Sequence, residues 1–338
     1  MPGTYEVTQV GKREDLADII AVADAKETPF TTMLKKDKEL VNTLFSWQVD
    51  EYDDPKTDSV REGVDVGKFE NASKHRQILQ GRTHKLRRSV MVTTEAERSK
   101  VAGVNDPDPQ GVHGATELAR AKAKKAIELK RDIELTFLSD NDSVEEGETA
   151  RRTRGLGCWL DSILQKDNPV PQKYQTPQSS IFKGSKADFT EATLRSLLES
   201  RWERTSGNDE LVAFMGPVVK NIINDFANFD PTKPGHLHIH TYTGGRIDRL
   251  DNTIDLYKGD YGSFEMHLSH FLPNKGRCCI LDINMLKQRY HTPPYYKDLQ
   301  NGGAGERGFT ETITALVALN PLGHILINID TASTLVNS

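Results

Sequence analysis

Three histidines at alternate positions have the spacing in this chain that most resembles a catalytic metal site. His236, His238 and His240 lie in the stretch HLHIHTYTG, whose alternation predicts a β-strand. On a strand their side chains face one side, as the His-x-His pairs of some metal sites do. No carboxylate or further histidine is spaced to complete the coordination, so a polar strand face is the favoured interpretation. A metal-dependent enzyme at these histidines is retained as one alternative.

The other short patterns do not complete a catalytic or cofactor site. The acidic run DEYDD at 50–54 supplies carboxylates but lacks the ligand spacing of a calcium loop, so we interpret it as a solvated turn. RGLG at 154–157 lacks the phosphate-loop pattern, and neither GxSxG nor HExxH occurs. Cys158 and the adjacent pair Cys278 and Cys279 have no local base signature. We therefore predict that the protein is not an enzyme and has no catalytic residue, cofactor or metal.

A basic segment offers a third kind of chemistry, contact with phosphate groups. RTHKLRR contains Arg82, Lys85, Arg87 and Arg88. The formal net charge of the 338-residue chain is −5, which repels a polyanion rather than attracting it. A nucleic-acid-binding protein that uses this basic segment is the other alternative. A salt-dependent affinity of the free subunit for DNA would identify it.

The composition is typical of a soluble protein with much surface for its size. Hydrophobic residues make up 36% of the chain and charged residues 28%, and 338 residues can bury a large core. The opening MPGTYEVTQVGKREDL is polar, and no window approaches the roughly 18–20 apolar residues of a membrane span. Three cysteines form no disulfide framework, so we expect synthesis in a reducing cytoplasm and no membrane partner.

The sequence predicts one long helix at residues 108–139, around which the rest of the chain is arranged. Asp108 before Pro109 favours a helix start, and Asn141 favours a left-handed stop. At 1.5 Å per residue the helix would span about 45 Å, lying on one layer of the fold with its other side wet. The apolar stripe is predicted at Ala115, Ala119, Ala123, Ala126, Ile133 and Phe137. Ion pairs are predicted between Glu117 and Arg120, Lys124 and Glu128, and Lys130 and Glu134.

Two segments before this helix have too little apolar sequence to fold alone. Residues 1–43 form an arm, with a short amphipathic helix near residues 15–23. Residues 44–95 form a long two-stranded excursion with a polar tip, in which Phe45, Trp47 and Val49 alternate on one limb. The return limb has Val90 and Val92 on one face. An isolated hairpin is marginal in water, so both segments are expected to lie on a neighbour.

Residues 151–284 predict a compact region of helices and strands. Its best-marked helix spans 186–207, with Asp188 and Glu191 as a capping box and Gly207 at its end. A buried strand at LVAFMG, a helix opened by Pro217, a strand pair in IDLYKGDYGSFEMHLSHFLP and a buried strand at RCCILDINML follow. Two final strands flank Asn320-Pro321-Leu322-Gly323. The predicted fold class is α+β.

This order of parts resembles the major capsid proteins of tailed bacteriophages with the HK97-like fold. The segments that are similar to one subgroup of that family are TPFTTMLKK, FSWQVDEYDDP, TRGLG, YKGDYGSFEMHLSHFLP and ETITALVALNPLGHILINI. The resemblance implies an N-arm at 1–43, an E-loop at 44–95 and a P-domain segment with the spine helix at 96–150. It further implies an A-domain at 151–284, and return strands of the P-domain and A-domain at 285–338, with the terminal strands in the P-domain sheet.

The resemblance also implies function and partners. The chain would self-assemble into the pentamers and hexamers of an icosahedral or prolate head that encloses double-stranded DNA, assembled in the host bacterial cytoplasm. Its partners would be copies of itself, a portal protein, packaged DNA and a separate scaffolding protein, since no long coiled coil precedes the arm; a decoration protein is a further candidate. The residues expected to make contacts between subunits are Phe45, Trp47, Asp50, Glu51, Asp53, Asp54, Phe69, Arg82, Lys85, Arg87 and Arg88. The acidic and basic members are expected to pair within or between chains.

Overall fold

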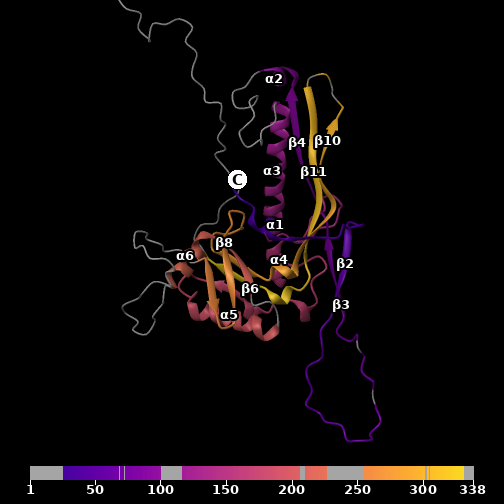
Figure 1. The fold of residues 1–338 in the computed structure, drawn as a ribbon, viewed down its shortest axis with the longest axis vertical. Helices are drawn as coiled ribbons and strands as arrows, with labels where there is room; N and C mark the ends of the chain where they lie inside the picture. The colour runs from indigo at the N-terminus through magenta and orange to yellow at the C-terminus, as the bar shows by residue number, and fades with distance from the viewer. Residues whose placement is uncertain are drawn as a thin grey trace, which may run out of the picture. The chain divides into compact units, whose positions relative to one another are not determined.

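A computed structural model describes residues 26–67, 69–71, 73–99, 116–205, 210–226, 255–300, 303 and 305–330 (Figure 1). The chain divides into two compact units. Of the described residues, those within 1–26, 87–129 and 294–311 form the first unit, and those within 27–86, 130–293 and 312–338 form the second. Helix α3 (Glu117–Leu138) and strands β4 (His84–Thr93), β10 (Leu286–Leu299) and β11 (Gly305–Ala318) have residues in both units. Helices and strands together confirm the α+β class. None of the described helices is long and apolar enough to cross a membrane.

The predicted long helix is present as α3, but its two ends differ from the prediction. The described helix begins at Glu117, and the predicted start at Asp108 and Pro109 lies outside the described residues. It ends at Leu138, where the Ser139 hydroxyl donates to the Thr136 carbonyl at 2.8 Å. Asn141 is not in the left-handed region, which among the described non-glycine residues only Asn168 adopts, at φ 45°. The predicted left-handed stop is therefore wrong.

The buried face of α3 also differs from the predicted alanine stripe. Ile133 and Phe137 are buried as predicted, but Ala126 is exposed. The buried apolar positions are Leu118, Leu129, Ile133, Phe137 and Leu138. Large side chains decide which face turns inward because they gain more from burial than alanine does.

Only one of the three predicted ion pairs on α3 forms as predicted. Glu117 and Arg120 lie 3.6 Å apart. Glu128 pairs with Lys125, at 2.6 Å, instead of Lys124. Glu134 is fully buried and bonds to the chain at residues 30–31, while the Lys130 ammonium donates to the Thr32 hydroxyl at 3.0 Å.

Within the first unit, β4, α2 (Thr94–Arg98) and the start of α3 are held together locally. Val90 and Val92 lie on one face of β4, as predicted, and pack with Leu118. The carboxylate of Glu97 accepts the Leu118 backbone N–H at 3.0 Å. Because that N–H belongs to the first turn of the described helix, the contact caps α3 at its N-terminal end.

A four-stranded sheet has the order β1-β10-β11-β4, where β1 is Lys35–Asp37. Arg289 on β10 donates to Asp37 at 2.6 Å, and this bond lowers the pKa of Asp37 to about 2. Strand β10 was not predicted. It contains Pro293 and Pro294, and prolines usually argue against a strand because they cannot donate to a ladder.

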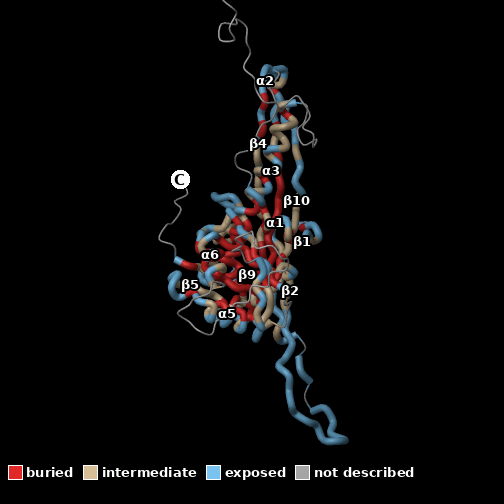
Figure 2. Tube along the Cα trace, turned by 60° about the vertical axis from the view of Figure 1, so that its left-hand side comes forward, coloured by how far each residue is buried: buried red, intermediate tan, exposed pale blue. Residues whose placement is uncertain are grey.

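The six-stranded sheet of the second unit contains the strands predicted between 210 and 284, with a C-terminal strand inserted. Its order is β5 (Ile181–Gly184), β12 (Ile325–Ile329), β9 (Arg277–Leu281), β6 (Glu210–Met215), β8 (Gly262–Leu268) and β7 (Leu256–Gly259). Strand β12 pairs parallel with β5 and antiparallel with β9. The expected return of both terminal strands to the sheet of the long helix is therefore wrong for β12. All of β9 is buried (Figure 2).

Helices α5 (Glu191–Arg204) and α6 (Pro217–Phe226) pack on this sheet through a shared apolar cluster. The predicted capping box of α5 is wrong in its cap. Thr190, not Asp188, is the N-cap, and its hydroxyl accepts the Thr193 N–H at 3.3 Å. Asp188 instead accepts the Ser185 hydroxyl at 2.7 Å. Gly207 lies outside the described residues, as do the amphipathic helix near 15–23 and the histidine strand.

The predicted excursion is a two-stranded ladder, β2 (Leu44–Val49) with β3 (Gln77–Arg82), in which Val49 lies opposite Gln77. The prediction of one hairpin over 44–95 needs a correction, because β4 belongs to the four-stranded sheet. The remaining short helices are α1 (Pro29–Met33), α4 (Leu156–Leu160), η2 (Ser162–Leu164), η3 (Gln172–Tyr174), η4 (Gln178–Ser180), η5 (Ile283–Met285) and η6 (Pro321–Gly323).

The RGLG segment has a packing role. A Cβ atom added at Gly155 would collide with the Ser139 carbonyl, and one added at Gly157 would collide with the Asp140 carboxylate. Only glycine allows the chain at α4 to approach the end of α3 this closely. All five residues of α4 are buried as a result.

Candidate assembly surface

The segment between β2 and β3, residues 50–76, is called the hairpin tip below. Every described residue from Asp50 to Lys74 is exposed (Figure 2). The large apolar side chains on the tip and their exposed fractions are Tyr52 97%, Val60 78%, Val64 58%, Val66 64% and Phe69 90%. Five large apolar side chains left uncovered in one segment are typical of an interaction surface.

The acidic cluster pairs locally, at the root of the tip. Asp53 accepts from Lys74 and from His75, both at 2.6 Å, and the Lys74 bond is the main cause of the lowered pKa of Asp53. Asp50 accepts from Arg76 at 3.2 Å. Glu51 pairs with Lys173 at 2.8 Å. Pairing within the chain was one of the two expectations for this cluster, although its described partners differ from the predicted basic cluster.

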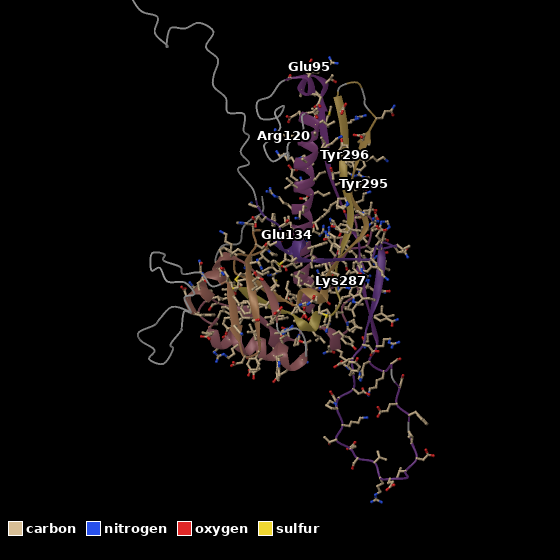
Figure 3. The ribbon with its side chains drawn as sticks, viewed as in Figure 1. Glu95, Arg120, Glu134, Lys287, Tyr295 and Tyr296 are labelled. Atoms are coloured by element: carbon tan, nitrogen blue, oxygen red, sulfur yellow. The ribbon has the colours of Figure 1, made fainter. Side chains whose placement is uncertain are left out.

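The basic cluster is divided between two strands and neutralised by other carboxylates. Arg82 on β3 pairs with Asp167 at 2.9 Å and with Glu145 at 3.3 Å. Arg87 on β4 pairs with Glu311 at 2.5 Å, and that carboxylate also accepts from the Tyr295 hydroxyl (Figure 3). Arg88 lies 4.0 Å from Glu128, and Lys85 is an exposed residue of β4. This neutralisation leaves the basic segment poorly suited to binding phosphate groups.

Aromatic side chains fix the base of the hairpin to the core of the second unit. Trp47 lies 5.7 Å from Trp159 and 5.8 Å from Phe45, measured between ring centroids. The Trp47 indole N–H donates to the Leu319 carbonyl at 3.4 Å. Phe45 lies over Gly81, its partner across the ladder, where a Cβ atom would come within 2.7 Å of the ring. Trp47 and Phe45 therefore have a role inside the chain.

A buried arginine supports the loop against which the hairpin base lies. Arg154, 1% exposed, donates to Asp142 at 2.8 Å, and its guanidinium lies 4.7 Å from the Trp159 ring centroid. Asp142 also accepts the backbone N–H groups of Lys166 and Asp167. Burial raises the pKa of Asp142, but these N–H groups and Arg154 outweigh burial and lower it. Because Asp167 in turn binds Arg82, the network connects the core to the hairpin.

Glu134 of α3 anchors the segment that precedes the four-stranded sheet (Figure 3). Its carboxylate accepts the backbone N–H of Phe30 at 3.0 Å and that of Thr31 at 2.6 Å, as well as the Thr31 hydroxyl. These are donors of the first turn of α1, which has no partner of its own for them. Burial is the main cause of the raised pKa of Glu134. Glu134 was not predicted as a positioning residue because its partners lie 103 and 104 positions away. Arg154 was not predicted because its partners lie in irregular segments 12 to 14 positions away, which no helical or strand period connects.

Glu134→Ala is expected to lower the free energy of unfolding by about 3 kcal/mol, since two buried N–H groups lose their acceptor. The loss should be larger at pH 5 than at pH 8. A folded pKa above the unfolded value contributes stability that is present at low pH and lost as the pH rises through the folded pKa. Urea unfolding at both pH values measures the effect. Glu128→Ala on the same helix, a partly exposed pair, should cost less than about 1 kcal/mol. Equal losses for the two variants would contradict the anchoring role.

The described residues offer little support for metal or thiol chemistry. They hold no group of three or more metal-ligating side chains, and the three predicted histidines lie outside them. Burial raises the pKa of Cys158 and of Cys279 to about 12, so neither thiol is a nucleophile near neutral pH.

Solved structures with a similar fold come from phage and phage-like capsids. The chain is similar to the capsid of a native GTA particle, with TM-score 0.64 and 9% identity over 97% of this chain and 99% of that chain. It is similar to Mycobacterium phage Bobi (TM-score 0.58, 9% identity, 95% and 96% covered) and to the capsid of the cyanophage P-SCSP1u (TM-score 0.55, 10% identity, 98% and 98% covered). The fold is the HK97-like fold of phage capsid proteins.

The chain belongs to the SU10 major capsid protein family, whose model matches residues 3–331. None of the curated proteins matches it. Membership makes the chain a structural protein of the virion capsid that assembles with copies of itself, and not an enzyme. The nucleic-acid-binding and metalloenzyme alternatives are not supported.

Proposed function

We propose that this major capsid protein forms closed rings of five and six copies in an icosahedral or prolate phage head. The head encloses double-stranded DNA without reading its sequence, and assembles in the cytoplasm of the bacterial host. Rings of this kind need heterologous contacts, in which one surface of a subunit meets a different surface of the next. A segment that extends from the subunit and is not covered by its own chain suits such a contact.

The observation that carries the proposal is the exposure of the hairpin tip. Phe69 and Tyr52 are 90% and 97% exposed in the single chain. Burying a side chain of this size contributes about 1.5–3 kcal/mol, so several tips per ring would stabilise a shell considerably. Because each subunit contacts several neighbours, individually weak contacts suffice to retain it.

The predicted contact residues have different parts in this proposal. Phe69 has no large role inside the described chain, and we propose that it contacts a neighbouring copy. Asp54 is exposed on the same tip and is proposed to make polar contacts there. Phe45 and Trp47 are proposed to act mainly by holding the base of the hairpin. Residues proposed to add charged contacts are Asp50, Glu51, Asp53, Arg82, Lys85, Arg87 and Arg88.

The division of the chain follows the HK97-like pattern in this proposal. Residues 1–43 are the N-arm, 44–95 the E-loop, 96–150 the P-domain segment with the spine helix, 151–284 the A-domain and 285–338 the return strands. The six-stranded sheet supports an A-domain built mainly from 151–284, with β12 added from the C-terminal segment.

The proposed partners beyond the shell itself are a portal protein, a separate scaffolding protein, packaged DNA and a decoration protein. A closed shell needs an entrance for DNA, which a portal supplies. A net charge of −5 supports loose, sequence-independent enclosure of DNA instead of tight binding.

Negative-stain microscopy of the expressed chain, alone and with its scaffolding and portal partners, tests the proposal. Closed shells with five-fold and six-fold rings are expected in at least one mixture. A compact monomer in every mixture would refute the proposal. A parallel measurement of DNA affinity against salt should find weak binding by the free subunit; tight binding with a steep salt slope would instead favour the nucleic-acid alternative.

A further inference from the structure

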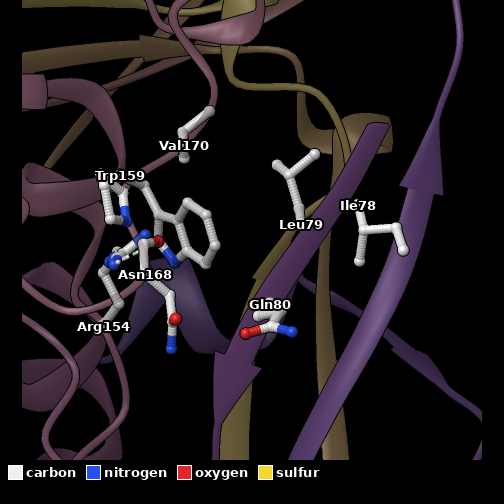
Figure 4. Close-up of a pocket in the computed structure, with 8 residues that line it drawn as sticks. Ile78, Leu79, Gln80, Arg154, Trp159, Asn168 and Val170 are labelled. Carbon is white, nitrogen blue, oxygen red and sulfur yellow. Dashed lines mark hydrogen bonds between the residues drawn. The ribbon is translucent and has the colours of Figure 1, made fainter. Parts of the chain in front are cut away.

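A cavity of about 230 Å³ lies beside the base of the hairpin, within the second unit (Figure 4). Leu79 and Gln80 of β3 line one side, and Trp159 and Val170 line the other (Figure 4). Arg154 and Asn168 also line the cavity. A space of this size accommodates several waters or one short side chain.

Two buried hydrogen-bond donors in this wall have no acceptor in the described structure. They are the Nη1 atom of Arg154 and the indole Nε1 of Trp159, and both residues are 1% exposed. The other two guanidinium nitrogens of Arg154 have acceptors. Nε donates to the Asp142 carboxylate, and Nη2 donates to the carbonyls of Asp167 and Asn168. A buried donor without an acceptor costs about 1–3 kcal/mol, so each such group calls for an explanation.

The charge of the wall selects the kind of acceptor. The lining residues include Arg154 and no carboxylate, and the Asp142 carboxylate that accepts from the Arg154 Nε is not among them. Leu79 and Val170 provide an apolar surface for an alkyl stem. Two donors from adjacent side chains suit the two oxygens of one carboxylate, and a charged acceptor makes a stronger bond than a neutral one.

We propose that this cavity is a binding site for a carboxylate group, held by Arg154 and Trp159. Both donor atoms are covered, so a ligand oxygen reaches them only after a rim side chain moves. Asn168 is the candidate, because it is exposed and lies beside Arg154 and Trp159 in Figure 4. The carboxylate comes either from a free small acid or from an acidic side chain of a second copy of this chain.

Titration of the full-length, unassembled subunit with propionate tests the site, with the indole N–H signals of the tryptophans followed by NMR. The Trp159 signal should shift, while the Trp47 signal should stay, because the Trp47 N–H already donates to Leu319. Propionamide has the same shape without the charge and should bind at least 10-fold more weakly. Asn168→Gly should tighten propionate binding several-fold, since glycine accepts the φ of 45° and uncovers the donors.

Electron cryomicroscopy of assembled shells identifies the source of the carboxylate. An aspartate or glutamate of a neighbouring copy inside the cavity would assign the site to assembly, and separate density for a small acid would assign it to a free ligand. No shift of Trp159 at 100 mM propionate, or equal shifts with propionamide, would overturn the proposal, and ordered water would then be the natural occupant. This test is independent of the proposed head geometry, because it uses the single subunit.

Discussion

Replacing residues 50–76 by Asn-Gly is expected to yield a folded subunit that forms no closed shells. Val49 and Gln77 lie opposite one another in the β2–β3 ladder, so a two-residue turn joins them without changing the register. Asn-Gly is the preferred sequence for such a turn. The change removes the exposed apolar side chains of the hairpin tip, while the ladder and the aromatic contacts at the hairpin base remain.

The subunit itself should lose little stability from this replacement. The removed residues from 50 to 74 are exposed wherever they are described, and their ion pairs are surface pairs that contribute about 0–1 kcal/mol each. The largest internal loss is the acceptor for the Tyr174 hydroxyl, the His75 carbonyl at 2.6 Å, which costs about 1 kcal/mol. The effect on assembly should be much larger, because every subunit of every ring lacks the same contact.

Circular dichroism and thermal unfolding measure the fold, and microscopy with sedimentation measures shell formation. A milder variant, Tyr52→Ser with Phe69→Ser, should leave unfolding unchanged and reduce the yield of shells at least 10-fold. Ile163→Ser, at a side chain 72% exposed outside the tip, serves as the matched control. Normal shells from the Asn-Gly variant would show that the hairpin tip is not needed between subunits.

Arg154→Met should be the most destabilising single substitution proposed here, at about 3–5 kcal/mol. Removing one partner of a buried ion pair leaves the other charge without compensation. Asp142 would keep its two backbone donors but lose the guanidinium, and the carbonyls of Asp167 and Asn168 would lose a donor. The loop that holds Arg82 would be less fixed, so the hairpin base should loosen as well.

Urea unfolding measures this loss. Arg195→Met removes a 58% exposed arginine that pairs with Glu191 on α5, and it should cost no more than about 0.5 kcal/mol. Asp142→Asn combined with Arg154→Met should recover part of the stability, because the uncompensated charge is gone. If Arg154→Met were as mild as Arg195→Met, the network would not be what supports the loop.

Elements with strong local signals were predicted well. The helix opened by Pro217, the strand at LVAFMG and the final pair of strands around Asn320-Pro321-Leu322-Gly323 all occur. The apolar run of β9 and the alternation of Phe45, Trp47 and Val49 are likewise present. In each case the apolar pattern of the element and the turn residues that bound it lie within a few positions of one another. A short stretch of sequence therefore suffices to predict the element.

Details that depend on competing neighbours were predicted poorly. Asp188 and Thr190 are both residue types that suit the N-cap of α5. Thr190 is the N-cap, because its hydroxyl accepts the Thr193 N–H. Alanines on α3 match the helical period, but Leu118 and Leu129 beside them are the buried positions, and Ala126 is exposed. Strand β10 forms despite two prolines because β11 pairs along it.

The sequence by itself determined the α+β class, the order of the parts and the presence of an extended segment too polar to bury itself, since all three follow from composition and local periodicity. The class of protein was indicated by the resemblance of several segments to a known family. Only the tertiary structure decided that the charged limbs of the excursion are neutralised within the chain, and that Glu134 and Arg154 are its buried anchors. The physical reason is distance along the chain. Glu134 caps residues 103 and 104 positions away, and Arg154 acts on a loop that in turn holds Arg82, 85 positions from Asp167. Such partners are chosen by folding, and no local pattern records them.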